Sequence, residues 1–321
     1  MTAGLKSWAK PLMHIAILNA GTGWHTDDLC RALGERGHTG RVLPYDRLIA
    51  RLGTTRGLAA GLSSAGADIL NADAVLARII PQGSLEQMIY RVDALHWIEK
   101  RGIPVVNSAR AIERSVDKFY TTALLQEAGL PTPETVICED ATEAMQAVLA
   151  MGDVIIKPIF GSMGHGMVRV SDPDVAFRVV RSLEQLQIVF YIQRAVDHGG
   201  RDVRVFVIGG RVLAAIERRA PVGQWRTNVS LGGAARRVEL PSSWEQMAIS
   251  AAATIGADYA GVDLLPSRDG TVFVLEVNGI PGWQGLNQAT GIDVAAAIVD
   301  HLAVRVRAGD AAAGRTAELP A

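Results

Sequence analysis

The sequence has few cysteines, almost no net charge and no long hydrophobic run. Its two cysteines, Cys30 and Cys138, lie far apart and form no CxxC pair, which argues against a disulfide framework or a zinc site and fits a reducing compartment. The 32 basic residues are balanced by 33 acidic ones, so no overall field attracts the chain to nucleic acid or to an anionic membrane. No stretch reaches the roughly 18 apolar residues that a spanning helix needs. We therefore expect a cytoplasmic protein that binds neither nucleic acid nor membranes.

The first third of this 321-residue chain alternates between apolar strands and helical patterns. Strands are expected at residues 14–20, 73–79 and 103–107, and helices at 26–38 and 85–102. This alternation predicts a parallel βαβ domain over residues 12–107, with Thr26 as the N-cap of the first helix. Residues 21–23 spell "GTG" without the third glycine and the spaced acidic residue of a dinucleotide site, which disfavours an NAD-dependent dehydrogenase.

The middle third contains a glycine-tipped β-hairpin. In "DVIIKPIFGSMGHGMVRV", two β-rich segments flank Gly161, Gly164 and Gly166. The order differs from that of a P-loop, because Lys157 precedes the glycines and no helix follows them. Glycine has no Cβ, so its backbone N–H groups can approach phosphates closely. A flexible hairpin tip is the alternative interpretation.

Two lysines favour phosphate binding at this hairpin. If Ser115 caps the helix that follows it, Lys118 lies in the first turn, where the helix dipole disfavours a cation. A bound phosphate would turn that penalty into an advantage. Lys157 ends the apolar run "VII" directly before Pro158. Taken alone, each lysine also fits a surface side chain with a partly buried stem.

The segment "YAGVDLLPSRDGTVFVLEVN" predicts an antiparallel hairpin with Asp269 and Gly270 as a two-residue turn. On that register Asp263 lies directly opposite Glu276, and Asn278 points to the same face. Like charges across a strand pair are destabilising, and burial raises the cost unless a cation is present. Oxygen donors without His or Cys are typical of Mg²⁺, whereas unrelated acids on a solvated hairpin face are the alternative.

Six motifs follow one another between Asp117 and Gly285, within a resemblance to a known family that extends from about His14 to Leu302. They are "DKFYTTALLQEAGLPTP", "IIKPIFGSMGHG", "RDVRVFVIGGRVLAAIERRA", "RTNVSLGGAA", "AGVDLL" and "LEVNGIPGWQG". In this combination and order the chain resembles the RimK-like α-L-glutamate ligases, a family of ATP-grasp enzymes. The resemblance implies an α/β (α+β) ATP-grasp fold: a pre-ATP-grasp domain with a parallel sheet at 12–107, a central lobe at 108–192 and a C-terminal lobe at 193–305, the two lobes enclosing ATP. The Ala-rich end, 306–321, is expected to be a mobile tail.

The resemblance also implies the site residues. The ATP phosphates would bind Lys118 and Lys157 beneath a loop that contains Gly161, Ser162, Gly164 and Gly166. Adenine would contact Gln193, Arg194 and Ala195, the ribose would contact Asp202, and Arg226 and Asn228 would contact nucleotide and substrate. Two Mg²⁺ ions, with Mn²⁺ as an alternative, would be bound by Asp263, Glu276 and Asn278. The hinge departs from the family pattern at Arg194, where an acidic residue is common. Backbone recognition of adenine tolerates that change, whereas a side-chain contact is in doubt.

The implied reaction explains why lysines and Mg²⁺ ligands occur together. A carboxylate resists attack by an amine, so ATP first converts it to an acyl phosphate, which the amine then displaces. Phosphoryl transfer needs positioning and charge neutralisation more than a protein nucleophile. Arg219 and Arg226 are the candidate catalytic residues, with Arg219 assigned to the oxyanion or the phosphorylated carboxyl and the backbone of Gly232 and Gly233 as further donors. An exposed ion pair is an equally good interpretation of Arg219.

The leading function is an ATP-dependent ligase that joins L-glutamate to an acceptor carboxylate, and the resemblance implies a homo-oligomer. Another ATP-using enzyme, such as a kinase, is the second class. A nucleotide-binding module without chemistry is the third, and the acidic trio disfavours it. Through Gly23, Trp24 and His25, the segment "GTGWHTDDLCRALGERGH" resembles the family members that act on tetrahydromethanopterin-type pterins, which implies a small pterin cofactor as acceptor. Trp24 and His25 would offer such a flat heterocycle a stacking face and hydrogen bonds. A ribosomal protein tail or a deazaflavin is the alternative acceptor, and packing of the first loop is the alternative role for the two rings.

Overall fold

The computed structural model describes residues 12–53, 60–161, 166–227 and 233–317, with side chains up to residue 308. The chain divides into two compact units, one of Met1–Ser108 with Ala295–Ala321 and one of Ala109–Val294. Across the described ranges, no helix is both long enough and apolar enough to cross a membrane.

The first unit is built on a parallel sheet with the strand order β2-β1-β6-β7. Its elements are β1 (His14–Asn19), α1 (Trp24–Glu35), β2 (Thr39–Pro44), the 3₁₀ turn η1 (Tyr45–Arg47), β3 (Leu48–Arg51), β4 (Gly61–Ser64), β5 (Ala67–Asp68), the 3₁₀ turn η2 (Ile69–Asn71), β6 (Ala74–Ala77), α2 (Leu85–Lys100), β7 (Val105–Val106) and α9 (Val294–Ala317). The predicted parallel βαβ organisation is confirmed. Strands β3, β4 and β5 form a separate antiparallel sheet.

Two helix ends in this unit differ from the sequence prediction. Helix α1 begins at Trp24 with Gly23 at the N-cap, and Thr26 lies inside the first turn, where its hydroxyl donates to the Gly23 carbonyl at 2.6 Å. Thr26 is therefore not the cap, because its side chain bonds back along the helix rather than forward to an open N–H group. Helix α9 continues to Ala317, into the segment expected to be a mobile tail. Alanine is the strongest helix former, which explains the helical backbone; mobility itself stays a prediction.

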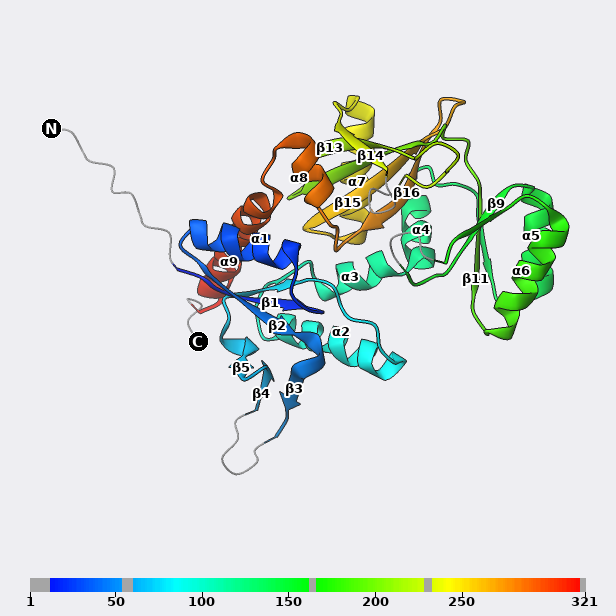
Figure 1. The fold of residues 1–321 in the computed structure, drawn as a ribbon. Coiled ribbons are helices and arrows are strands. Elements are labelled where there is room, and N and C mark those ends of the chain that lie inside the picture. The colour runs from blue at the N-terminus through cyan, green and yellow to red at the C-terminus, as the bar shows by residue number, and fades with distance from the viewer. Residues whose placement is uncertain (1–11, 54–59, 162–165, 228–232, 318–321) are drawn as a thin grey trace. The chain divides into compact units, whose positions relative to one another are not determined.

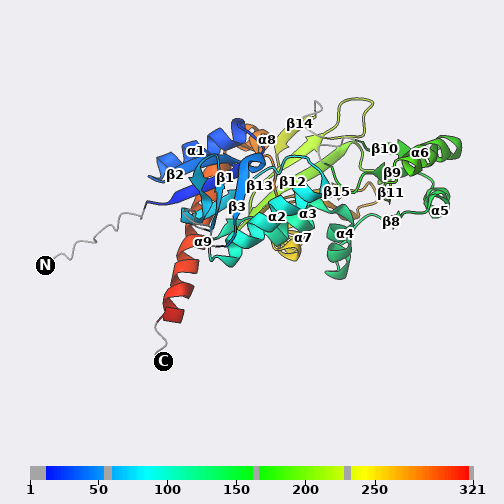
Figure 2. The same cartoon turned by 90° about the horizontal axis from the view of Figure 1, so that it is seen from below.

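The second unit contains two antiparallel sheets (Figures 1 and 2). Its elements are α3 (Ala109–Val116), α4 (Lys118–Glu127), β8 (Thr135–Cys138), α5 (Ala141–Met151), β9 (Val154–Lys157), β10 (Val168–Val170), α6 (Pro173–Gln185), β11 (Phe190–Arg194), β12 (Arg201–Ile208), β13 (Arg211–Arg219), β14 (Ala234–Arg237), α7 (Ser242–Ile255), β15 (Tyr259–Pro266), β16 (Val272–Asn278) and α8 (Gln284–Thr290).

In the smaller sheet, of order β10-β9-β11-β8, helices α5 and α6 pack side by side on one face (Figure 1). The larger sheet has the order β14-β13-β12-β15-β16, and α7 covers the apolar face to which Val205, Val262 and Val277 belong. Strand β11 ends at Arg194, so the smaller sheet extends past the predicted lobe boundary at residue 192. The opposite face of the larger sheet carries the polar residues on which the site depends.

Candidate active site

Helix α4 places Lys118 at the glycine hairpin. The N-cap of α4 is Asp117, whose carboxylate accepts from the Tyr120 N–H at 3.0 Å. Ser115 belongs to α3 and donates to the Ile112 carbonyl, so it is not the predicted cap; Asp117 precedes the helix directly and takes that role. Lys118 is nonetheless in the first turn, as predicted.

The Lys118 ammonium reaches the start of the glycine hairpin, where its Nζ donates to the carbonyls of Ile159 at 3.1 Å and Gly161 at 2.8 Å. Strands β9 and β10 pair antiparallel on either side, so the predicted hairpin is confirmed. Gly166 has φ +75°, a conformation that side chains rarely adopt. Ser162 and Gly164 lie outside the described residues.

Lys157 is buried, with only 8% of the residue exposed. Its Nζ donates to Gln193 Oε1 at 2.6 Å and lies 5.7 Å from the centre of the Tyr191 ring. The Gln193 amide donates in turn to Thr135 Oγ1 at 3.0 Å, which fixes its orientation. Burial lowers the pKa of Lys157 to about 8, an effect that Glu276 opposes and Lys118 reinforces. A buried ammonium bonded to a neutral amide is a site prepared for an anion.

Glu276 joins the lysines into one cluster. Burial also lowers the pKa of Lys118, and the nearby Glu276 carboxylate again works against that change. One carboxylate from β16 is therefore close enough to act on ammonium groups from α4 and β9. The structure brings together the predicted phosphate lysines and one of the three predicted metal ligands.

Strands β15 and β16 pair so that Asp263 lies opposite Glu276 and Gly261 opposite Asn278. The predicted pairing is confirmed, but the predicted turn is wrong by one residue. Ser267 bonds to Thr271 through its N–H at 2.8 Å, which leaves a three-residue loop. A bulge between Asp263 and Leu264 then restores the register.

The cation that neutralises Asp263 in this structure is arginine. Arg204 makes a bidentate contact with the Asp263 carboxylate at 2.7 Å and 2.7 Å, and Arg218 approaches it to 2.9 Å. Burial alone would raise the pKa of Asp263, but the two guanidinium groups lower it to about 2. Within the described ranges, no group of three or more His, Cys, Asp or Glu side chains could hold a metal ion.

Arg218 also bonds to Asp202, at 2.7 Å and 2.6 Å, and Thr227 donates to the same carboxylate at 2.5 Å. The predicted ribose residue is thus deep in an ion-pair network. Sequence reasoning missed Arg204 and Arg218. The sequence does contain a signal for Arg204. Residues 202 and 204 are two apart on one strand, so their side chains lie on the same face of the sheet as those of their cross-strand partners.

Arg219 lies on the other face of β13 from Arg218. It is 59% exposed and donates from Nε to Glu217 at 2.7 Å. The structure therefore does not bring Arg219 together with Asp263 and Arg218. Arg226 donates to the Met167 carbonyl at 2.7 Å, which ties it to the far strand of the glycine hairpin. Asn228 and Gly232 lie outside the described residues.

At the predicted adenine hinge, Arg194 is bound by protein groups. Its guanidinium pairs with Glu134 at 2.6 Å and donates to the Met151 carbonyl at 2.8 Å. The Ala195 N–H donates to the Asp153 carbonyl at 2.8 Å. The charge of Arg194 is thus paired within the protein.

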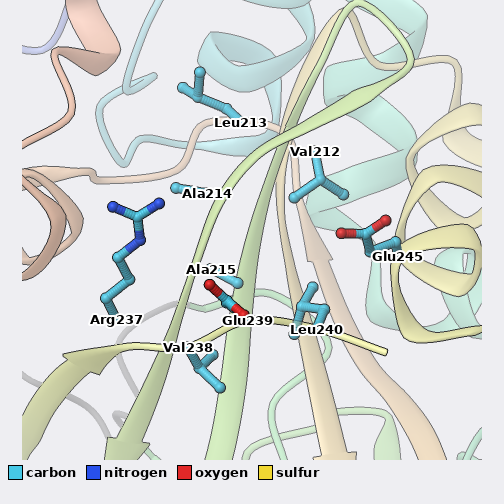
Figure 3. Close-up of a pocket in the computed structure, with 9 residues that line it drawn as sticks. All are labelled: Val212, Leu213, Ala214, Ala215, Arg237, Val238, Glu239, Leu240 and Glu245. Atoms are coloured by element: carbon cyan, nitrogen blue, oxygen red, sulfur yellow. The ribbon is translucent and has the colours of Figure 1, made fainter. Parts of the chain in front are cut away.

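A separate pocket of about 340 Å³ lies along the outer edge of β13 (Figure 3). Glu239 and Leu240, which follow β14, and Glu245 of α7 are among its lining residues. It contains none of the sequence-predicted site residues, so it is distinct from the lysine cluster.

In the first unit, Trp24 and His25 meet edge to face, with ring centroids 5.0 Å apart and planes at 87°. Burial, aided by Arg78, lowers the pKa of His25 to about 4. The imidazole is therefore neutral near pH 7 and can both donate and accept hydrogen bonds. Trp24 is 40% exposed.

A glycine hairpin with two lysines beside it, a carboxylate-bearing β-hairpin and a preceding parallel domain define the ATP-grasp class. A RimK-like ATP-grasp domain model matches residues 115–302, and a RimK PreATP-grasp domain model matches residues 13–112. The chain belongs to the RimK-like ATP-grasp family, and it is an ATP-dependent carboxylate–amine ligase.

Similar proteins support this assignment. The tetrahydromethanopterin:alpha-L-glutamate ligase of Methanosarcina acetivorans is 31% identical over 307 residues, covering 87% of this chain and 95% of that protein. A probable alpha-L-glutamate ligase of Xanthomonas euvesicatoria pv. vesicatoria is 34% identical and covers 92% and 99%. The ATP-grasp ligase PsnB, complexed with minimal precursor, Mg and ADP, has the same fold with a TM-score of 0.72 at 22% identity, covering 95% and 100%.

Proposed function

We propose that this ligase uses ATP and Mg²⁺ to join L-glutamate to a carboxylate of a tetrahydromethanopterin-type pterin cofactor. The observation that carries the ATP chemistry is the convergence of Lys118, Lys157 and Glu276 at the glycine hairpin. The acceptor rests on the relatives named for tetrahydromethanopterin, at 31% and 28% identity over 87% and 90% of this chain. Trp24 and His25 supply a flat apolar edge and a neutral imidazole for such a ring.

In the first step, an oxygen of the acceptor carboxylate attacks the γ-phosphorus of ATP, and ADP leaves. Lys118 and Lys157 would hold the phosphates, because a phosphate oxygen can replace the carbonyl and amide groups that now accept from their Nζ atoms. The backbone of residues 193–195 would meet adenine. Asp202 is fully engaged with Arg218 and Thr227, so the proposal assigns it to positioning Arg218 rather than to the ribose.

The oxygen donors fit Mg²⁺ in part. Glu276 and Asn278 have hard oxygens on one face, and Asn278 Oδ1 keeps a second lone pair besides the bond from the Ile280 N–H at 2.9 Å. Asp263 can become a third ligand only when Arg204 leaves its carboxylate. Bound Mg²⁺ would supply charge neutralisation at the phosphate oxygens.

In the second step, the glutamate amine attacks the acyl carbon, an oxyanion forms, and phosphate leaves. Arg218 and Arg204 lie on the face that carries Asp263 and Glu276, so they are the arginines proposed to stabilise this charge. Arg219 is not included, because it faces the other side of the sheet. Arg226 is proposed to order the hairpin over the nucleotide through the Met167 carbonyl.

A peptide acceptor is the second candidate. Several solved structures of the same fold are complexes with precursor peptides, among them PsnB with PsnA2 at a TM-score of 0.69 and 22% identity. A ribosomal protein C-terminus or a deazaflavin would be served by the same acyl-phosphate chemistry. A binding module without catalysis is disfavoured by the family to which the chain belongs.

Mass spectrometry of purified protein with ATP, Mg²⁺, L-glutamate and each acceptor tests the proposal. Addition of one glutamyl residue to the pterin, with ADP and phosphate formed only when glutamate is present, is the expected result. Lys157→Met is the matched inactive control, since it keeps an apolar stem in the buried site. Glutamylation of a ribosomal protein tail with the pterin unchanged would refute the pterin assignment and leave the ligase mechanism standing.

A further inference from the structure

A buried chain of hydrogen bonds connects the two lysines at the glycine hairpin. Strand β11 places Tyr191 directly opposite Lys157 of β9, and both side chains are buried. The Tyr191 hydroxyl lies 2.8 Å from Thr122 Oγ1 on α4 and 3.3 Å from Gln193 Nε2. Thr122 bonds in turn to the carbonyl of Lys118 at 2.7 Å. Because Lys157 donates to Gln193, three side chains join its ammonium to the backbone of Lys118.

The direction of each bond follows from the protons that each group carries. A hydroxyl has one proton to donate, and a backbone carbonyl can only accept. Thr122 therefore donates to the Lys118 carbonyl, and its oxygen accepts from Tyr191. Burial raises the pKa of Tyr191, so the hydroxyl keeps its proton near neutral pH and can donate it. Because that proton points to Thr122, the Tyr191 oxygen accepts from Gln193 Nε2.

The same reasoning applies to the second partner of the Gln193 amide nitrogen. Thr135 donates to the Pro133 carbonyl at 2.7 Å, so its oxygen accepts from Gln193 Nε2 at 3.0 Å. Both hydroxyls that face Nε2 direct their own protons elsewhere, so neither can donate to a carbonyl oxygen in its place. The Gln193 side chain is therefore held with Oε1 toward Lys157, 2.6 Å from Nζ. A flipped amide would instead turn N–H donors toward an ammonium.

We propose that Tyr191 is a positioning residue for ATP: its hydroxyl fixes the orientation of the Gln193 amide, and through it the place of the Lys157 ammonium. The Tyr191 ring supports the same group, since its centre lies 5.7 Å from Nζ of Lys157. Thr122 completes the chain by accepting the Tyr191 proton and ties α4 to β11. The role rests on the proposed contact between Lys157 and the ATP phosphates, and it adds residues that this contact does not include.

Two substitutions disturb the chain in different ways and leave both lysines in place. Tyr191→Phe keeps the ring but removes the hydroxyl, so a buried N–H of Gln193 loses its acceptor. Thr122→Val removes the acceptor of the Tyr191 proton, so the hydroxyl turns that proton toward Gln193 and favours the flipped amide. In both variants Lys157 loses the fixed oxygen that holds its ammonium.

Dissociation constants of the full chain for ADP and for adenosine, measured with Mg²⁺, test this role. Each single variant should bind ADP about tenfold more weakly than the wild type, or about 1.4 kcal/mol. Adenosine affinity should stay the same, because adenosine has no phosphate for Lys157 to bind. The double variant should bind ADP no more weakly than Tyr191→Phe alone, since Thr122 has no proton to accept once the hydroxyl is gone.

The matched control is Tyr259→Phe, which removes the hydroxyl of another buried tyrosine, on β15 of the larger sheet. It should change ADP affinity by less than about twofold. A similar loss in Tyr259→Phe, equal losses for ADP and adenosine, or additive losses in the double variant would indicate a general packing effect and overturn the proposal. Melting temperatures show whether each variant is folded at the temperature of the titration.

Lys157→Met separates the role of Tyr191 from the assignment on which it rests. Weaker ADP binding in Lys157→Met with wild-type binding in Tyr191→Phe overturns the positioning role and keeps the phosphate assignment. Unchanged ADP affinity in Lys157→Met overturns the phosphate assignment and the positioning role together. In steady-state ligation, Tyr191→Phe should raise KM for ATP about tenfold and leave KM for glutamate unchanged, and equal increases in both would overturn the role. The ADP measurements need no acceptor, so failure of the pterin assignment leaves them unaffected.

Discussion

Raising the pH through about 8 is expected to discharge Lys157 and weaken nucleotide binding. The ammonium is buried, donates to the neutral Gln193 amide and has a pKa lowered from 10.5 to about 8. If phosphate binds only the charged form, the dissociation constant for ADP should rise about tenfold between about pH 7 and about pH 9. Lys118, Glu276 and Tyr191 are the other titratable groups at this position, and burial shifts Lys118 in the same direction.

The same shift has the opposite sign for folding. Between about pH 8 and 10.5 the unfolded chain binds more protons at Lys157 than the folded protein does, so the contribution of this group to stability rises with pH. The penalty for burying the charged form is about 3 kcal/mol below that window. As the pH rises, Lys157 should therefore reduce the free energy of unfolding of the ADP-free protein by less. The additional stabilisation that ADP gives should decrease over the same range.

Isothermal titration calorimetry with ADP and Mg²⁺, in buffers of different ionisation enthalpy, measures both the affinity and the proton taken up. Lys157→Arg is the control, because its guanidinium stays charged over the whole range. Proton uptake near pH 8 that disappears in this variant is the expected outcome. An ADP affinity that is flat from pH 7 to 9 in the wild type would refute the assignment of Lys157 to the phosphates.

The remaining predictions concern Glu276 and Arg218 of the site, Arg219 on the opposite face of the sheet, and Trp24 of the first unit. Glu276→Gln should abolish ligation at ordinary Mg²⁺ with the melting temperature unchanged, and wild-type turnover in that variant would exclude Glu276 as a metal ligand. Arg218→Met should cost about 3–5 kcal/mol in urea unfolding, because the buried Asp202 carboxylate loses the guanidinium that pairs with it and Asp263 keeps only Arg204, whereas Arg219→Met should cost less than about 1 kcal/mol; equal losses would contradict the two-face arrangement. Trp24→Ala should raise KM for the pterin without altering ADP affinity, and an unchanged KM would leave Trp24 a packing residue.

The spacing of apolar residues along the sequence predicted the strands and helices well where one side of the element is buried. The parallel sheet of the first unit and the glycine hairpin follow directly from apolar runs separated by turn residues. Helix ends were predicted less well, because Ser115 and Asp117 are both good caps and only the break between α3 and α4 decides between them.

The pairing of Asp263 with Glu276 was predicted correctly from a turn that was placed incorrectly. The prediction used a two-residue turn at Asp269 and Gly270, whereas the loop has one more residue and a bulge near Leu264 compensates for it. Bulges add one residue to one strand, so they restore a register that the turn has displaced. A count along the sequence cannot detect two such errors when they cancel.

The partner of Asp263 could not be read from the sequence for a different reason. Two acids facing each other require a cation, but the pattern does not distinguish a metal from an arginine on a neighbouring strand. Arg204 and Arg218 come from strands β12 and β13, and their approach depends on sheet order rather than on local spacing. The three-oxygen metal site stays a prediction, and in this structure the Asp263 carboxylate is paired with the two arginines.

The charges on the site face determine how much negative charge of a nucleotide the protein can balance by itself. The described cations there are Lys118, Lys157, Arg204 and Arg218, and the carboxylates are Asp202, Asp263 and Glu276. The positive surplus without a ligand is thus small, which keeps the buried network tolerable. A triphosphate brings more negative charge than this surplus can balance, and bound Mg²⁺ would supply the difference. Glu276 would hold the ion, with Asp263 as a further ligand only if its carboxylate exchanged Arg204 for the metal; Arg204 would then be available to an anionic acyl phosphate.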